Sequence, residues 1–411
     1  MVASVVVVGG GIAGVSTIGA LRDGGFQGDL TLIDAGEFPY DRPPLSKDYL
    51  AGSTEIKDIA LQTPQWYDDN RVRMMTENAV AALRPGLGAV ELADGTTVSA
   101  DRVVLAMGGR ACRPPIPGSD GTRVHVLRTA DDADRLGATL VPGARLLIVG
   151  AGLIGAEVAS TAGGLGCEVV LADPVWPPLS AAFSPDVAAW LHGMHEKRGV
   201  TTVNSAVKAF NDAAGGISAT FAGDNEAQSF DAALLAVGMA PETALAEAAG
   251  LRVDRGIVVD ARQVTSNPAI LAVGDVATRG AEGLSVNRSE HWEAARHDGQ
   301  RAAAAILGIA PPADTAPWFW TDRHGVHVEV VGALSNADQY WQRGSVGEPP
   351  FSVFAVRDGL VVGAVSVGDS TAVRAARRLI DRGIPVDPAQ LIDPTTDLRK
   401  LVRGRPTEGM K

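Results

Sequence analysis

Two glycine-rich segments have the residue types and the spacing of a dinucleotide phosphate site. Each follows a run of β-branched or aliphatic residues and has the form Gly-x-Gly-x-x-Gly. In such a turn the first glycine permits the tight bend, the second lets the backbone approach a pyrophosphate, and the third lets the following helix pack closely. The N-terminus of that helix presents N–H groups to the phosphates. The glycines are Gly9, Gly11 and Gly14 in the first segment and Gly150, Gly152 and Gly155 in the second.

An aspartate follows the next strand in both segments, at Asp34 and at Asp173. A carboxylate in this place accepts hydrogen bonds from the hydroxyl groups of an adenosine ribose. Strand, glycine turn, Ala-rich helix and acid-terminated strand together predict a βαβ unit, and the chain contains this pattern twice. Two such units predict two dinucleotides, one fixed and one exchangeable, with a hydride passing between them.

Length, charge and cysteine content exclude several classes of protein. A chain of 411 residues predicts two or three domains, and a formal net charge of −12 argues against a nucleic-acid or anionic-membrane partner. Cys112 and Cys167 are far apart and form neither a C-x-x-C nor a metal-ligand spacing, so we expect no dithiol centre and no metal. The sequence has neither a signal-peptide pattern nor an apolar segment long enough to span a membrane, so we expect a cytoplasmic protein.

Patterns after the second βαβ unit predict further elements. Residues 256–275 alternate as strands do, and residues 289–308 have a helical pattern. The segment 310–320 has the composition of a linker. Strands in period-2 alternation follow it, and a helix over 370–383 closes this last region.

The segment PYDRPPLSKDYLAG, residues 39–52, resembles a run found in the FAD-dependent ferredoxin reductases of oxygenase and cytochrome P450 systems, which are glutathione-reductase-like flavoproteins. The resemblance covers nearly the whole chain. It implies an α/β fold with two Rossmann-like dinucleotide-binding domains of glutathione-reductase type and a C-terminal α+β domain. The implied boundaries are 1–112 and 239–315 for a discontinuous FAD-binding domain, 113–238 for an NAD-binding domain, and 316–411 for a C-terminal interface domain.

The resemblance also implies roles for individual residues. Lys47 is expected beside the flavin ring, Glu157 is expected to pair with that lysine, and Trp320 is expected against the ring, so these three are the candidate catalytic residues. A cation near the ring stabilises its anionic reduced form. Gly238 is expected to join the second glycine turn and Asp173 in binding NAD. The other expected FAD contacts, besides the first glycine turn and Asp34, are Arg42, Val80, Gly108, Arg128, Asp275 and Trp292.

The mechanism that the resemblance implies depends on positioning. A hydride passes from NADH to FAD, and electrons then pass singly to a [2Fe–2S] ferredoxin. Residues 371–411 contain nine Lys or Arg residues and five Asp or Glu residues, although the chain as a whole is acidic. This imbalance predicts a basic patch that steers an acidic ferredoxin toward Trp320.

The stretch LADPVWPPL, residues 171–179, departs from the family pattern. The family has arginines four and eight residues after the acid, where this chain has Pro177 and Ala181. Each lost charge-assisted bond weakens NADH binding by about ten- to a hundredfold. The family also has an asparagine after the Gly-x-x-Pro of the nicotinamide domain, where this chain has Glu242. Asp173 still repels a 2′-phosphate, so we expect NADH to be preferred to NADPH but to bind weakly.

Three functions remain open at this level. The leading hypothesis is an NADH-dependent ferredoxin reductase. The second is an FAD flavoprotein of the same fold with little NADH activity, which uses another donor or acceptor as an oxidase or quinone reductase does. The third is a non-catalytic FAD-binding partner of an oxygenase. Rapid bleaching of the flavin by stoichiometric NADH separates the first hypothesis from the other two.

Overall fold

The computed structural model describes residues 2–224, 226–280 and 290–402, and the chain folds as two compact units. Unit 1 consists of Met1–Pro44, Thr54–Arg110 and Met239–Ala313. Unit 2 consists of Leu45–Ser53, Ala111–Gly238 and Asp314–Lys411. The three-domain division stated above is finer than this division into two units, and it stays a prediction.

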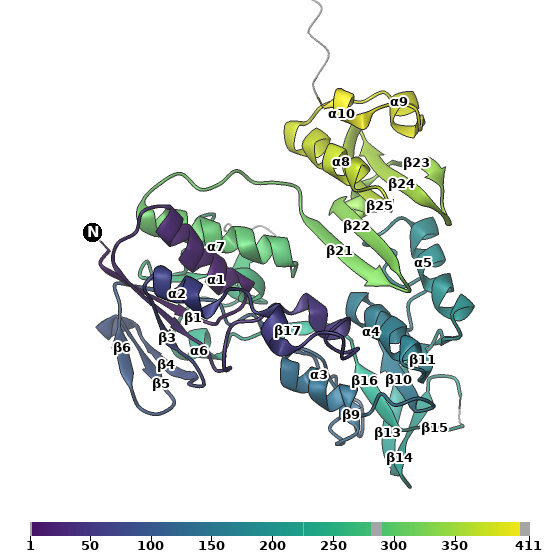
Figure 1. The fold of residues 1–411 in the computed structure, drawn as a ribbon, viewed down its shortest axis with the longest axis horizontal. Coiled ribbons are helices and arrows are strands. Elements are labelled where there is room, and N and C mark those ends of the chain that lie inside the picture. The colour runs from purple at the N-terminus through teal and green to yellow at the C-terminus, as the bar shows by residue number, and fades with distance from the viewer. Residues whose placement is uncertain (1, 225, 281–289, 403–411) are drawn as a thin grey trace, which may run out of the picture. The chain divides into compact units, whose positions relative to one another are not determined.

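A five-stranded parallel sheet of order β19-β7-β1-β2-β3 forms the centre of unit 1 (Figure 1). Because parallel sheets are buried on both faces, their strands read as continuous apolar runs, as β1 does. Val5 and Val7 of β1 pack with the helices α1 and α7, and Val6 and Val8 pack toward the antiparallel sheet of β4, β5 and β6. The main elements are β1 (Ser4–Val8), α1 (Ile12–Asp23), β2 (Asp29–Ile33), β3 (Val72–Met75), β4 (Val80–Arg84), β5 (Ala89–Leu92), β6 (Thr97–Ser99), β7 (Arg102–Leu105), β19 (Ile270–Ala272) and α7 (Trp292–Leu307).

Shorter elements complete unit 1. The strand β8 (Gly109–Ala111) is formed as the chain leaves this unit, and β17 (Met239–Pro241) begins as it returns. The predicted alternating segment 256–275 forms two separate strands, because a turn at 260–263 interrupts it. The helix predicted over 289–308 is α7, and residue 289 lies outside the described residues. The remaining elements are α2 (Pro64–Asp69), α6 (Ala244–Ala248), β18 (Ile257–Val259) and β20 (Ala277–Arg279).

Unit 2 contains a second five-stranded parallel sheet, of order β12-β11-β10-β16-β9. Leu147 and Val149 of β10 pack with Phe210, Phe221 and Phe230 of a three-stranded antiparallel sheet. The parallel strands are β9 (Val124–His125), β10 (Arg145–Val149), β11 (Glu168–Ala172), β12 (Thr201–Val203) and β16 (Ala232–Leu235). The helices are α3 (Ala130–Gly137), α4 (Leu153–Gly164) and α5 (Pro185–Lys197), and the antiparallel strands are β13 (Val207–Ala213), β14 (Gly216–Phe221) and β15 (Gln228–Phe230).

The C-terminal part of unit 2 is a five-stranded antiparallel sheet of order β21-β22-β25-β24-β23 (Figure 1). Alternate residues of its strands face two cores, since Phe354 packs with α8, whereas Val353 packs with Val187 and Leu191 of α5. A helix that follows the second dinucleotide turn therefore shares a core with this sheet. The elements are β21 (Trp318–Arg323), β22 (Val326–Gly332), β23 (Gln339–Ser345), β24 (Glu348–Arg357), β25 (Leu360–Val367), α8 (Ser370–Arg382), α9 (Pro388–Ile392) and α10 (Leu398–Leu401).

Helix α8 confirms the helix predicted over 370–383. Of the basic segment 371–411, residues 403–411 lie outside the described residues. In the part of the chain that the structure describes, we find no helix with both the length and the apolar character needed to cross a membrane.

Candidate functional site

The first glycine turn joins β1 to α1. Gly9 has a φ of +106°, and a Cβ atom there would lie 2.4 Å from the carbonyl oxygen of Ala106. A Cβ atom on Gly14 would lie 2.1 Å from the carbonyl oxygen of Gly9, so only glycine lets α1 pack this closely. At Gly11 a Cβ atom would have no described atom within 4 Å beyond its chain neighbours and helix backbone. The turn is closed on the side of the sheet and open at the N-terminus of α1.

The second turn, between β10 and α4, repeats this geometry. Gly150 has a φ of +100°, and its Cβ atom would lie 2.4 Å from the carbonyl oxygen of Ala236. A Cβ atom on Gly155 would lie 1.9 Å from the carbonyl oxygen of Gly150, and one on Gly152 would again meet no described atom within 4 Å. The N-cap residues of α1 and α4 are Gly11 and Gly152, which have no side chain to accept a hydrogen bond from the helix. The first N–H groups of both helices are therefore available to an anion.

The two strand-terminal aspartates tether their turns in the same way. In each, Oδ2 accepts a hydrogen bond from an N–H of the glycine turn, and Oδ1 accepts one from the residue two positions further along. A carboxylate held like this keeps lone pairs for a ribose hydroxyl. The donors are Gly10 and Gly36 (2.6 Å) for Asp34, and Ala151 and Val175 (both 2.8 Å) for Asp173.

Glu157, in the second turn of α4, is the centre of a buried polar cluster in unit 2. Lys47 Nζ lies 2.9 Å from Glu157 Oε2, so the predicted ion pair is present. Ser46 Oγ donates to the same oxygen at 2.6 Å, and Thr321 Oγ1 donates to Oε1 at 2.7 Å. The backbone N–H of Asp322 adds a longer bond of 3.3 Å. These donors compensate the carboxylate for its burial and fix the direction in which Lys47 reaches it.

The two tryptophans expected at the flavin are held by different partners. Trp292, at the start of α7 in unit 1, donates through Nε1 to Asp41 Oδ1 at 2.8 Å. Trp320, on β21 in unit 2, is stacked on Trp318 with a centroid separation of 5.1 Å and an interplanar angle of 29°. Each indole therefore has a defined orientation within its own unit.

The other expected contacts occupy strand ends and turns. In unit 1, Val80 opens β4, Gly108 has a φ of +68° in the irregular segment between β7 and β8, and Asp275 lies in the short 3₁₀ turn Gly274–Val276. Arg42 lies in unit 1, in the irregular segment that precedes the 3₁₀ turn Pro43–Ser46. In unit 2, the N–H of Arg128 donates to Asp132 Oδ2 within the cap of α3, and Gly238 has a φ of +106°. Contact of these residues with a cofactor stays a prediction.

Comparison with known proteins decides the family. Residues 3–299 match the pyridine nucleotide-disulphide oxidoreductase family, and residues 318–402 match the reductase C-terminal family. The chain belongs to the pyridine nucleotide-disulphide oxidoreductases. Within that family it belongs to the ferredoxin reductases. It is 37% identical over 406 residues to the anthranilate 1,2-dioxygenase system ferredoxin–NAD(+) reductase component of Burkholderia cepacia, with 97% of this chain and 98% of the relative covered.

Two further comparisons agree with this placement. The chain is 35% identical over 401 residues to the benzene 1,2-dioxygenase system ferredoxin–NAD(+) reductase subunit of Pseudomonas putida, covering 97% of each. Its fold matches a chain in the solved covalent complex of putidaredoxin reductase and putidaredoxin, with a TM-score of 0.91 and 31% identity over 97% of this chain and 98% of that one. The predicted family and the predicted α/β fold class are confirmed.

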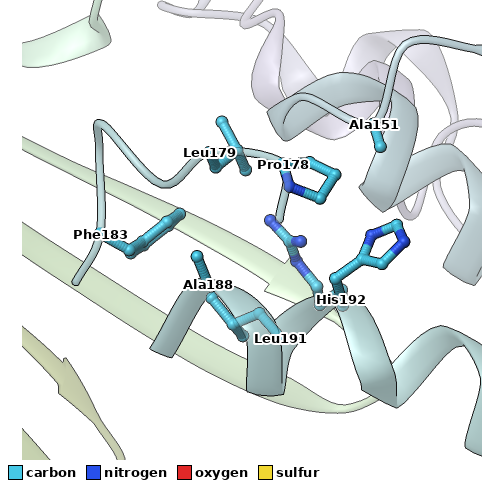
Figure 2. Close-up of a pocket in the computed structure, with 8 residues that line it drawn as sticks. Ala151, Pro178, Leu179, Phe183, Ala188, Leu191 and His192 are labelled. Carbon is cyan, nitrogen blue, oxygen red and sulfur yellow. The ribbon is translucent and has the colours of Figure 1, made fainter. Parts of the chain in front are cut away.

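In this member of the ferredoxin reductases, the loop between β11 and α5 has an unusual composition and a defined structure. No Lys or Arg occurs between Asp173 and Ser184. Pro178 and Leu179 lie over Ala188 and Leu191 of α5, and Figure 2 shows these residues around a narrow crevice. The side chain of Ala181 is exposed, so a longer residue could extend from this position into solvent.

Sequence reasoning missed a second polar cluster in unit 2, formed by the buried Arg323 and His195 and the half-buried His324. His324 Nε2 lies 2.9 Å from His195 Nδ1, and Arg323 is 3% exposed. Burial lowers the pKa of His195 to about 2, that of His324 to about 4 and that of Arg323 to about 10. Arg323 makes no ion pair with any residue that the structure describes, although the negative charge of Glu157 acts on it. The one sequence signal was the Arg-His pair that follows the PWFWTD motif.

Asp298 of α7 is the other residue that sequence reasoning missed. Its carboxylate accepts from Gln263 Nε2 at 2.7 Å, from Arg301 Nη1 at 3.2 Å and from the N–H of Gly274 at 3.3 Å. Burial raises the pKa of this carboxyl to about 6. Asp298 therefore anchors the turn that carries Asp275.

Proposed function

We propose that this chain is an NADH-dependent ferredoxin reductase that uses FAD to transfer electrons singly to a [2Fe–2S] ferredoxin of an oxygenase or cytochrome P450 system. The observation that carries the proposal is the glycine turn with its tethered aspartate, which is present twice in a chain whose two cysteines form no disulfide. Two dinucleotide sites support hydride transfer between two cofactors. Both cysteines are free, so electrons must leave to an external acceptor. The relatives named above are ferredoxin–NAD(+) reductases, and this supports ferredoxin as that acceptor.

The residues of unit 1 fit the adenosine and pyrophosphate end of FAD. The open N-terminus of α1 offers N–H groups to the pyrophosphate, and Asp34, which Gly36 tethers, is the residue we assign to the adenosine ribose. Asp275, on the turn that Asp298 anchors, is the residue we assign to the ribityl chain. When bound, FAD accepts a hydride and gives up electrons one at a time.

Lys47 and Glu157 have different tasks in this proposal. Lys47 is the cation assigned to the flavin ring, where its charge favours the reduced anionic state. Glu157 acts through Lys47, because its buried carboxylate holds the ammonium group at 2.9 Å. Trp320, fixed by stacking on Trp318, is assigned to the ring itself.

The cytoplasm is the compartment that we propose for this reaction. Both cysteines are free thiols, as is usual in a reducing compartment. NADH is also a cytoplasmic reductant. Cell fractionation with detection of the chain in the cytoplasmic fraction tests this assignment.

The experiment that tests the cofactor assignment is identification of the flavin released on heat denaturation of the purified protein. We expect one FAD per chain, released without covalent attachment, because no Cys or His occupies a tethering position in the flavin motifs. Release of FMN, or of no flavin, would contradict the proposal. Loss of the yellow colour within seconds of anaerobic NADH addition would then separate the reductase from the oxidase, quinone reductase and non-catalytic alternatives.

A further inference from the structure

Exposed apolar side chains gather at one edge of the parallel sheet of unit 2. Eight large hydrophobic residues are exposed in the part of the chain that the structure describes. Four of the eight follow the carboxyl ends of the adjacent strands β10, β11 and β16, either in the loop after the strand or, for Ile154, in the first turn of α4. These are Ile154 (43% exposed), Val175 (56%), Trp176 (53%) and Val237 (40%). In open α/β sheets this edge is where ligands bind, so the gathering points to a ligand with an apolar face.

Trp176 is the largest of these side chains, and its position is fixed. Its ring makes an edge-to-face contact with His192 of α5, with centroids 4.7 Å apart and planes at 89°. His192 itself is buried, and Pro174, Pro177 and Pro178 restrict the backbone on both sides of Trp176. The indole is therefore half exposed and also ordered by its neighbours, as a stacking surface has to be.

The loop that carries Trp176 is tethered to the second glycine turn without covering it. Asp173 accepts hydrogen bonds from Ala151 in the turn and from Val175, the residue before Trp176. No described atom other than its chain neighbours and helix backbone lies within 4 Å of the position a Cβ atom would take at Gly152. A dinucleotide bound at this turn, with its ribose at Asp173, would have its adenine base within reach of the residues that follow Asp173. Trp176 is the third of these.

We propose that Trp176 is the adenine platform of the NADH site, and that stacking on its indole replaces the cationic contacts absent at Pro177 and Ala181. This inference rests on the proposed function and identifies how that site recognises its donor. A flat adenine ring stacks on an aromatic face without needing a charge partner. NADH binding by this chain then depends on the adenosine half of the molecule, and the adenine contact itself depends only weakly on ionic strength, because it is not a contact between charges.

The test compares Trp176→Ala, Trp176→Phe and the parent, all loaded with FAD. Calorimetry measures binding of ADP-ribose, which has the adenine but no nicotinamide. Stopped-flow measures flavin reduction by NADH and by reduced nicotinamide mononucleotide, which has no adenine. Val141→Ala is the matched control, since Val141 is 54% exposed but lies before β10, away from this edge.

We expect Trp176→Ala to weaken ADP-ribose binding and to raise the half-saturating NADH concentration by about tenfold. Trp176→Phe should stay within about threefold of the parent, and no variant should change half-saturation by reduced nicotinamide mononucleotide. Equal ADP-ribose affinity in the parent and in Trp176→Ala would overturn the inference, as would an equal loss with the mononucleotide. ADP-ribose binding does not require hydride transfer. Failure of NADH to reduce the parent would therefore count against the proposed function, whereas the comparison of ADP-ribose affinities would still test the role of Trp176.

Discussion

Lys47 Nζ lies 2.9 Å from Glu157 Oε2, and the Glu157 side chain is only 4% exposed. The two residues are 110 positions apart in the sequence. Two hydroxyl groups and one backbone N–H also donate hydrogen bonds to the same carboxylate. Such a cluster leaves an uncompensated charge if one member is removed. The pair is thus both a structural element of unit 2 and the element that orients the proposed flavin-side cation.

Glu157→Gln should lower the free energy of unfolding by about 2–4 kcal/mol, because Lys47 and the hydroxyl donors lose their buried anion. Urea unfolding of the FAD-loaded protein measures this. The control is Lys57→Met, which removes the exposed pair with Glu55 at 2.8 Å and should change the free energy by less than about 1 kcal/mol. Equal effects of the two substitutions would show that the Glu157 cluster does not contribute as a buried network.

Acid should destabilise the chain through His195. Burial lowers the pKa of this fully buried ring to about 2, whereas in the unfolded chain it titrates near 6.5. Between these values only the unfolded chain takes up the proton. The contribution of His195 to stability is therefore complete above about pH 6.5 and falls below it by up to about 1.4 kcal/mol per pH unit. Urea unfolding at pH 7.5, 6 and 5 should show a shallower fall for His195→Asn, and equal slopes would contradict the assignment.

The fold followed from the sequence where it depends on local pattern. The glycines of both turns, Asp34 and Asp173 are close in sequence to the strands that position them, so spacing alone placed them. The pairing of Lys47 with Glu157 came from family resemblance, because no local pattern links residues so far apart. The contact of His195 with His324 could not be predicted from a local pattern either, because these residues are 129 positions apart.

The loop after Asp173 shows a different limit of sequence reasoning. The residues VWPPL are compatible with a plug that fills the nucleotide site and with a surface that receives the nucleotide. What decides between them is whether Trp176 points into the unit or outward. That depends on Phe183 and Leu179, which pack into the core shared by α5 and the C-terminal sheet and so fix the course of the loop.

Ala181→Arg should strengthen NADH binding by about tenfold, or about 1.4 kcal/mol, by restoring one phosphate contact. The exposed position accepts a long side chain without repacking. The visible spectrum of the flavin should not change, and the gain should shrink at high salt. Stopped-flow reduction over a range of NADH concentrations measures the effect. A half-saturation equal to that of the parent would mean that the loop does not border the phosphates.

The basic residues of α8 should accelerate reaction with an acidic ferredoxin at low ionic strength. Arg374 and Arg378 are exposed, whereas Arg377 is half-buried and donates to Thr315 Oγ1 at 2.9 Å. The pair Arg374→Glu and Arg378→Glu therefore tests steering more cleanly than reversal at Arg377. Ferredoxin-coupled turnover should slow several-fold at low salt and recover at high salt. Arg252→Glu, an exposed reversal in unit 1, is the control, and the same rate loss in that variant would remove the α8 patch from the account.

The most direct test of the whole account is an anaerobic two-step mixing experiment with the FAD-loaded protein. One equivalent of NADH is added first, and an oxidised [2Fe–2S] ferredoxin is added in excess once the flavin absorbance has settled. We expect NADH to bleach the flavin within seconds, and the flavin colour to return as two equivalents of ferredoxin become reduced. A flavin that NADH does not bleach, or one that stays bleached in the presence of ferredoxin, would contradict the assignment of this chain as an NADH-dependent ferredoxin reductase.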